Sequence, residues 1–136
     1  MDRNLQIIGL ARKAGLLAVG ADDVSKALRT GKAWLVISAG DASEAALRRA
    51  CKGAEYSGVT YTVVPHSSFE LGSITGRGSP GTAAILDAGL AARFMRGLAD
   101  TDPERYRDTA DILTQKAVAE AEKKRRAPSG KRRILQ

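Results

Sequence analysis

The order of apolar and polar residues predicts helices that alternate with short strands along most of the chain. Several stretches carry apolar residues every three or four positions, which is the spacing of one helical face, and glycines such as Gly15 and Gly31 end two of them. Shorter stretches between them are continuously apolar or rich in β-branched and aromatic residues, which is typical of strands. We expect helices near residues 5–14, 24–30, 47–54 and 87–98, and strands near residues 16–19, 33–39, 60–64 and 82–86.

A brief helix and a glycine-rich loop are expected between the last two of these strands. Ser67 is followed three positions later by Glu70, which is the pattern of a capping box, and this opens a helix through Ile74. The loop GRGSPG, residues 76–81, then leads into the last strand.

The alternation of strands and helices indicates the α/β class. We predict a three-layer α/β/α sandwich in which a small mixed sheet of about four strands carries helices on both faces. Pro103, after Thr101 and Asp102, starts an additional C-terminal helix whose apolar stripe continues to about Ala117. We assign residues 1–100 to the main domain, 101–118 to this docking helix and 119–136 to a basic tail without regular structure.

Composition and charge narrow the classes of function. The chain has 136 residues, 43% of them hydrophobic, which suffices for one domain with a core. Its formal net charge of +7 favours a polyanionic partner, which usually means nucleic acid. Residues 119–136 hold 7 basic and 2 acidic side chains, a net charge of +5, so most of the excess positive charge lies in the tail.

Other features point to a soluble cytoplasmic protein. No apolar run approaches the roughly 20 residues that span a bilayer, so we expect no membrane partner. The N-terminus MDRNLQIIGL lacks the basic segment and long apolar core of a signal peptide. Cys51 is the only cysteine and has no partner for an internal disulfide, which fits a reducing compartment.

Residues of the kinds that form catalytic or metal sites are few. His66, the only histidine, is either a general base or, more commonly for this position, an ordinary loop histidine at a strand end. Cys51 lies on the apolar face of its helix, where a small buried hydrophobe is more common than a nucleophile. The GRGSPG loop lacks the lysine and Ser/Thr of a P-loop. We expect no enzyme activity, metal or cofactor.

Four short segments carry a family pattern. They are GLARKAG at residues 9–15, the glycine, acidic pair and V-x-K of residues 20–26, the strand LVI with Asp41 after it, and the pair Leu71 and Gly72 before the glycine-rich loop. Together they resemble the L7Ae/L30e superfamily of ribosomal proteins, nearest to its bacterial YlxQ-like branch, over about residues 4–98. The resemblance implies an α/β/α sandwich that binds structured RNA without catalysis, in many members a kink-turn with tandem sheared G·A pairs.

The resemblance also implies where RNA would bind. In the kink-turn binders the positions of Asp22 and Asp23 look like asparagine and glutamate, and a lysine stands at the position of Lys26. Asparagine donates and accepts hydrogen bonds, whereas ionised aspartate only accepts, so Asp22 can bind guanine N1–H and N2–H but repels O6 and phosphate. The implied RNA-binding residues are Gly20, Ala21, Asp22, Asp23, Lys26, Arg29, Lys32, Thr75, Gly76, Arg77, Gly78 and Ser79.

Each part of this RNA face also has an ordinary structural explanation. Asp22 or Asp23 can cap the free amides of the helix, and we weigh capping and base contact evenly. The basic residues can bind phosphate or only face solvent, and the glycine-rich loop can be a simple connection. Asp41 and Ser43 can both be caps of the third helix. We expect the aromatic residues to be core rather than a stacking surface: Trp34, Tyr61, Phe69 and Phe94.

Three hypotheses of function remain at this point. The first is an RNA-binding protein associated with ribosomes or their assembly. The second is an adaptor that contacts a ribosomal or transcription protein through the helix at residues 106–117, with non-specific nucleic-acid affinity from the basic tail. The third is the substrate-binding domain of an RNA-modifying enzyme, for which the chain has no room for a catalytic domain.

Overall fold

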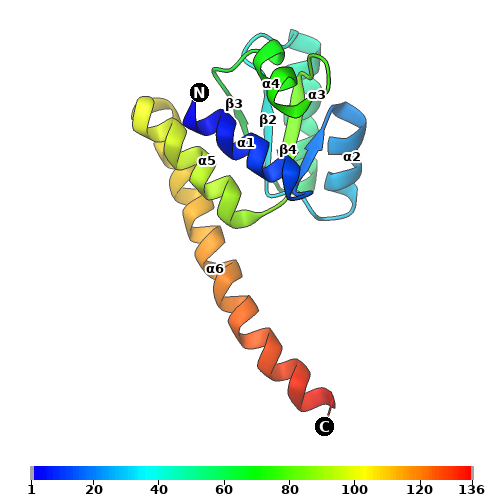
Figure 1. The fold of residues 1–136 in the computed structure, drawn as a ribbon, viewed down its shortest axis with the longest axis vertical. Coiled ribbons are helices and arrows are strands. Elements are labelled where there is room, and N and C mark those ends of the chain that lie inside the picture. Colours follow the sequence, from blue (N-terminus) through cyan, green and yellow to red (C-terminus); the bar gives the residue numbers. More distant parts are fainter. Residues whose placement is uncertain (1, 136) are drawn as a thin grey trace.

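The helices and strands follow one another in the order that the apolar pattern predicts (Figure 1). A computed structural model describes residues 2–135, and the side chains of residues 2–126. The elements are α1 (Arg3–Lys13), β1 (Leu17–Val19), α2 (Ala21–Arg29), β2 (Leu35–Ser38), α3 (Glu44–Ser57), β3 (Thr60–Val63), α4 (Ser68–Thr75), β4 (Thr82–Ile85), α5 (Ala88–Thr101) and α6 (Pro103–Leu135).

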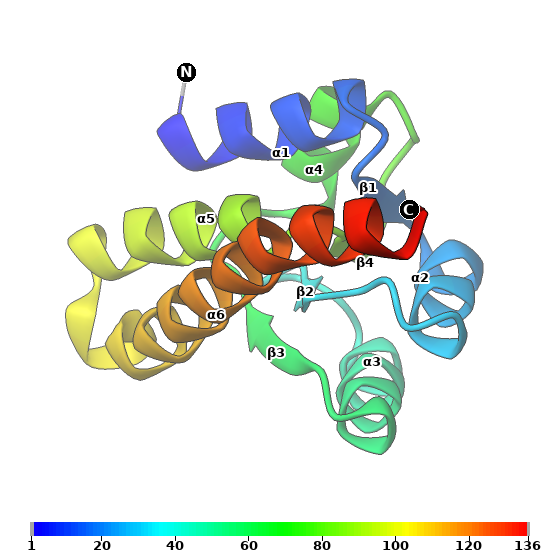
Figure 2. The same ribbon diagram turned by 90° about the horizontal axis from the view of Figure 1, so that it is seen from below.

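The four strands form one mixed sheet in the order β1-β4-β2-β3. β2 and β3 are parallel, whereas β4 runs antiparallel to both of its neighbours. Helices α1, α4, α5 and α6 cover one face and α2 and α3 the other, which Figure 2 shows as three layers. The predicted α/β/α sandwich with an additional C-terminal helix is therefore confirmed.

The register of the strands shows which strand ends lie together at each of two opposite edges of the sheet. Val19 pairs with Ala83, and Ser38 pairs with both Val63 and Thr82. The ends of β1, β2 and β3 and the beginning of β4 therefore lie along one edge, which we call the upper edge. The opposite ends of the strands, with the C-terminus of α2, form the lower edge.

The core lies mainly between the sheet and the layer that contains α1 and α5. Ile8 of α1, Ile37 of β2 and Phe94 of α5 are fully buried there. α6 joins the same core, since Leu113 is also fully buried and the Tyr106 hydroxyl donates to the carbonyl of Val63 at 3.0 Å. Because its buried residues share one cluster with those of α1 and α5, the first part of α6 is packed onto the domain.

α6 is longer than the sequence led us to predict. The apolar stripe ends near Ala117, where we expected the helix to end and an irregular tail to begin, but the helix continues to Leu135. The sequence AEAEKKRR that follows Val118 consists of strong helix formers, and Glu120 stands four positions before Lys124, a favourable spacing. A helix that already exists also needs no new nucleation to continue.

The aromatic residues divide between core and surface. Phe94 is fully buried, and Trp34 and Tyr61 are partly buried against the two hydrophobic clusters, as predicted. The prediction was wrong for Phe69, whose exposure is 73%. The short helix α4 turns Leu71 inward, and Phe69, two positions earlier, lies on the other side of the helix.

Candidate nucleic-acid interface

The N-terminus of α2 lacks a side-chain cap. Gly20 occupies the N-cap position with a φ of 92°, a left-handed conformation that favours glycine, and its amide donates to the carbonyl of Thr82 at 2.9 Å. Within the described residues, no hydrogen bond joins the carboxylate of Asp22 or Asp23 to an amide of this turn. The exposed acidic pair therefore does not cap the helix, and the amides of the first turn face outward at its positive end.

The glycine-rich loop folds back onto the helix that precedes it. Gly76 and Gly78 have φ values of 72° and 62°, which reverse the chain direction after α4. The carbonyl of Gly78 lies so close to Gly72 that a Cβ at Gly72 would overlap it. This contact gives the pair Leu71 and Gly72 a physical role, because only glycine leaves room for the loop.

Arg77 joins this loop to the start of α2. Its Nη2 atom lies 3.3 Å from Oδ2 of Asp23 and 3.5 Å from the carbonyl oxygen of Val19. Both side chains are about half exposed, at 53% and 52%. The two segments that the sequence analysis assigned to RNA thus form one continuous surface at the upper edge, with Asp23 as an anchor for the loop.

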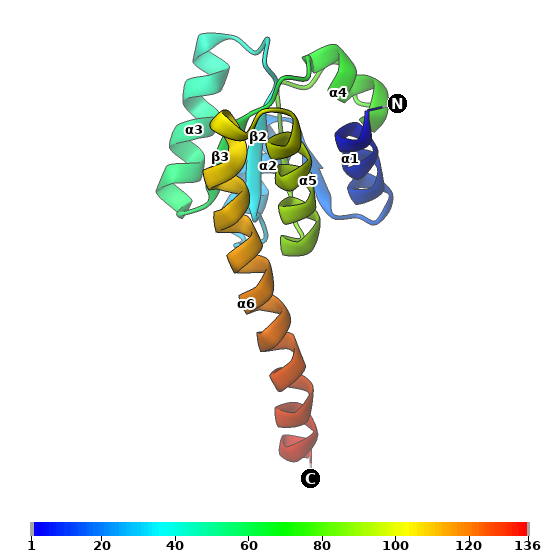
Figure 3. The same cartoon turned by 90° about the vertical axis from the view of Figure 1, so that its left-hand side faces the viewer.

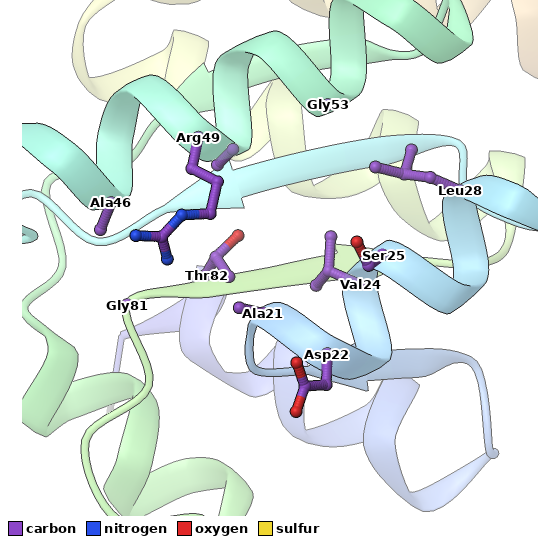
Figure 4. Close-up of a pocket in the computed structure, with 11 residues that line it drawn as sticks. Ala21, Asp22, Val24, Ser25, Leu28, Ala46, Arg49, Gly53, Gly81 and Thr82 are labelled. Atoms are coloured by element: carbon purple, nitrogen blue, oxygen red, sulfur yellow. The ribbon is translucent and has the colours of Figure 1, made fainter.

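A cleft of about 290 Å³ opens beside this surface, between α2 and α3. Figure 4 shows Arg49 of α3 reaching into it from one wall, with Asp22 of α2 on the other side. Ser25 and Thr82 add hydroxyl groups to its lining. The sequence analysis missed Arg49, because its position opposite Asp22 depends on how α3 packs beside α2.

The side chain of Arg12, near the C-terminal end of α1, reaches the glycine-rich loop. Nη1 of Arg12 lies 3.6 Å from the position that a Cβ of Gly76 would occupy, so this guanidinium covers the turn of the loop. Lys13 follows in the last turn of α1 and is exposed. Together with Leu10 and Ile74 they line a groove of about 380 Å³ between α1 and α4. The segment GLARKAG thus places one cation, Arg12, beside the glycine-rich loop.

Not every predicted residue belongs to this surface. Thr75 is 1% exposed, and its hydroxyl donates to the carbonyl of Leu71 at 2.8 Å, so its side chain lies inside the fold. Arg29 and Lys32 are exposed but belong to the lower edge, at the other end of α2. A nine-residue helix spans about 13 Å, which separates them from the first turn. Lys26, one turn after Asp23 and exposed, remains within reach of the upper edge.

Asp41 and Ser43 have different roles. Oγ of Ser43 accepts from the amide of Ala46 at 3.1 Å and so caps α3, as predicted. Asp41 instead accepts from the amide of Ser68 at 2.8 Å and so holds the first turn of α4 beside the end of β2. Asp41 therefore orients α4, the helix from which the glycine-rich loop departs.

His66 is a buried structural residue. It is 4% exposed, and its Nε2 lies 3.2 Å from Oδ2 of Asp2, the N-cap of α1. Burial alone would raise the pKa of Asp2, but the hydrogen bonds from His66 and from the amides of Asn4 and Leu5 outweigh it and lower the pKa. The pair joins the start of α1 to the end of β3 and lies away from the cleft between α2 and α3.

The described residues contain no cluster of three or more His, Cys, Asp or Glu side chains that could hold a metal ion. Among their helices, none combines the length and the hydropathy needed to cross a membrane.

Comparison with known proteins finds one family and similar structures. Residues 3–93 match the model of the "Ribosomal protein L7Ae/L30e/S12e/Gadd45 family". A protein with unknown function from Bacillus halodurans C is 25% identical with a TM-score of 0.64, over 71% of this chain and 97% of that one. A Giardia lamblia 15.5kD RNA binding protein is 24% identical with a TM-score of 0.56, over 66% of this chain and 79% of that one. Among curated protein sequences there is no match.

Proposed function

The chain belongs to the ribosomal protein L7Ae/L30e/S12e/Gadd45 family, and from this premise we propose that it is a non-catalytic protein that binds structured RNA through the upper edge of its sheet. The observation that carries the proposal is the link from Arg77 to Asp23, which makes one surface of the glycine-rich loop and the first turn of α2. The Giardia neighbour, described as an RNA binding protein, supports the same class of partner.

The chemistry of this surface suits an RNA backbone that approaches closely. Free amides at the positive end of α2 can donate hydrogen bonds to a phosphate, and glycines at positions 20, 76 and 78 let the two backbones come near each other. Lys26 and Arg12 add exposed cations near this point that can pair with further phosphates. These contacts position the RNA without reading its sequence.

Asp22 is the residue that can read a base. Asp23 is paired with Arg77, whereas Asp22 is exposed and, among the described residues, makes no ion pair within 4 Å. Its carboxylate can accept from N1–H and N2–H of a guanine, while its charge disfavours the O6 edge. We therefore propose a kink-turn-like or ribosomal RNA in which a guanine presents its donor edge, and a role in ribosome assembly or translation in the cytoplasm.

The adaptor hypothesis is less well supported. It relied on the apolar stripe of residues 106–117 to contact a protein partner. Tyr106, Ala110 and Leu113 of that stripe are buried in the protein's own core, which leaves Ile112, at 47% exposure, on the outer side. The stripe is thus already used within the fold.

A pair of matched double variants tests the proposal. Lys26→Ala with Arg77→Ala removes two cations from the upper edge, and Arg29→Ala with Lys32→Ala removes two from the lower edge. We expect the first pair to weaken binding of a short structured RNA at least about tenfold, and the second to change it much less, because only the first removes a phosphate contact at Lys26 and the tether between the loop and α2 at Arg77. Equal losses in fluorescence anisotropy titrations would refute the assigned surface.

A further inference from the structure

The last part of α6 extends the molecule away from the upper edge. Figures 1 and 3 show α6 running past the sheet and projecting beyond the domain on the side opposite α4. Where it departs, Ala121 and Lys124 line a shallow pocket together with Trp34 and Asp87, which flank the lower ends of β2 and β4. The projecting segment therefore starts at the lower edge of the sheet.

The described part of this segment is strongly basic. Lys123, Lys124, Arg125 and Arg126 are consecutive and exposed. Arg125 Nη2 lies 3.9 Å from Oε1 of Glu122, and this exposed ion pair contributes little and leaves most of the positive charge unbalanced. We call these four residues the α6 cation cluster.

The distribution of charge around α6 indicates the kind of partner. Four consecutive residues of a helix point in directions 100° apart, so the cations surround the helix instead of lining one face. No apolar stripe accompanies them, as an interfacial membrane helix or a coiled coil would require. A helix that is cationic on all sides is complementary to the phosphate backbone of a double helix, which presents negative charge along its whole length.

The α6 cation cluster lies well away from the upper edge. The strands span about 10 Å between the two edges, and about nine residues of helix from Ala117 to Arg126 add roughly 13 Å in the same general direction. The α6 cation cluster and the Arg77 loop thus lie at opposite ends of the molecule.

We propose that the α6 cation cluster is a second RNA-binding surface, which binds the phosphate backbone of a double-helical segment while the upper edge binds a structured element. One protein molecule then holds two RNA segments together. This inference rests on the proposed function for the first segment, whereas the second surface recognises charge and helical shape alone.

The test uses the full chain and two quadruple variants with the same net charge. The cluster variant carries Lys123→Gln, Lys124→Gln, Arg125→Gln and Arg126→Gln, in which glutamine preserves helix propensity. The control variant carries Lys52→Gln, Arg93→Gln, Arg105→Gln and Arg107→Gln, four exposed residues elsewhere on the domain. The probes are a 20-base-pair RNA duplex, a length of about two helical turns, and a kink-turn hairpin with a short stem.

The cluster variant and the upper-edge variant are each expected to lose affinity for a different RNA. The cluster variant should bind the duplex at least about tenfold more weakly. The dependence of its affinity on salt should also be less steep, since each lost phosphate contact reduces the slope of log binding constant against log salt concentration by somewhat less than one. Its affinity for the hairpin should change less than about threefold, whereas Lys26→Ala with Arg77→Ala should lose the hairpin and keep the duplex. Beads that carry the hairpin should retain fluorescent duplex only in the presence of the wild-type or control protein.

Two results would overturn the inference. If the cluster variant binds the duplex as well as the control variant does, the cations only face solvent. If the protein binds each RNA but never retains both on one bead, the two surfaces are not separate. If the proposed function is wrong instead, the variant Lys26→Ala with Arg77→Ala binds the hairpin as tightly as the wild type does. The cluster variant then still binds the duplex more weakly than the control variant does.

Discussion

Arg77, in the loop after α4, donates to the carboxylate of Asp23 at the start of α2, with 3.3 Å between Nη2 and Oδ2. This contact gives one of the two adjacent acids at the N-terminus of α2 a role in a basic chain. One of them, Asp23, holds the loop in place, and the other, Asp22, remains open to a ligand. Asp23 therefore joins the loop to α2, and neither acid caps the helix.

Because Asp23 anchors the loop, its removal is expected to change RNA affinity in the direction opposite to that expected from net charge alone. Removing an acid from a protein that binds RNA should raise its affinity by reducing repulsion. We expect Asp23→Ala instead to lower the affinity for structured RNA, because the loop loses its tether, with the stability changed by less than about 1 kcal/mol since the ion pair is exposed. Asp108→Asn on α6, an exposed acid far from the interface, serves as the control. A gain in affinity for Asp23→Ala equal to that of the control would contradict the anchor role.

Asp22 should determine which RNA is preferred. Asp22→Asn restores a hydrogen-bond donor at the position where kink-turn binders look like asparagine, so we expect it to raise the affinity for a kink-turn relative to a plain duplex. Competition titrations of wild-type and variant protein with the two RNAs measure this ratio. An unchanged ratio would mean that Asp22 contacts no base edge.

The close packing of the loop against Gly72 predicts that a larger side chain at this position lowers both stability and RNA affinity. In Gly72→Ala the new Cβ would overlap the carbonyl of Gly78, so the loop must move, and we expect both a lower melting temperature and weaker RNA binding. Gly53→Ala is the matched control, since its Cβ would lie 3.4 Å from Leu28 Cδ1, an ordinary contact, and alanine favours the helix. If both variants keep wild-type affinity for RNA, the loop does not contribute to the interface.

The lowered pKa of Asp2 predicts that the stability of the protein depends on pH. Its pKa is lowered in the folded protein, so its ionised form contributes stability at neutral pH, and this contribution is lost as the pH falls through the folded pKa, below the ordinary value of 3.8. Asp2→Asn keeps a good helix cap but cannot ionise. The difference in the free energy of unfolding between wild type and Asp2→Asn should therefore shrink toward zero in urea titrations as the pH is lowered from neutral to well below 3.8. A difference that is constant from neutral to acidic pH would exclude this role.

Two neighbours in α6 test whether this helix is part of the core. Leu113 is 0% exposed and Ile112 is 47% exposed. We expect Leu113→Ala to cost about 2–5 kcal/mol and Ile112→Ala less than about 1 kcal/mol, because only the first leaves a cavity. Denaturant titrations of the two variants give both values, and similar small losses would show that α6 is only loosely attached.

The fold was predictable because the apolar spacing is regular and glycines mark the ends of the elements. Gly15, Gly31 and Gly58 follow helices and have positive φ values, so a local signal in the sequence corresponds to a local requirement of the backbone. The length of α6 was not predictable from its apolar stripe, because helix propensity continues where the stripe stops. Phe69 was misplaced because a helix of eight residues buries only one narrow side.

The candidate interface was predictable in part. The segments at residues 20–26 and 76–79 were found through family resemblance, but their contact depends on the pairing of Val19 with Ala83, which no local pattern shows. Arg12 and Arg49 were missed for the same reason, since their distance from the loop and from Asp22 is set by helix packing. Arg29 and Lys32 were included because they are close in sequence, although the length of α2 places them at the other edge.

The most direct test of the account measures RNA preference by fluorescence anisotropy. Wild-type protein and the variant Lys26→Ala with Arg77→Ala are titrated with a kink-turn RNA, the same RNA with its G·A pairs replaced, and a plain duplex, each at two salt concentrations. The account predicts that the wild type prefers a structured RNA over the duplex and that the variant loses this preference. Binding that is equal for all three RNAs, steeply dependent on salt and unaffected by the two substitutions would contradict it.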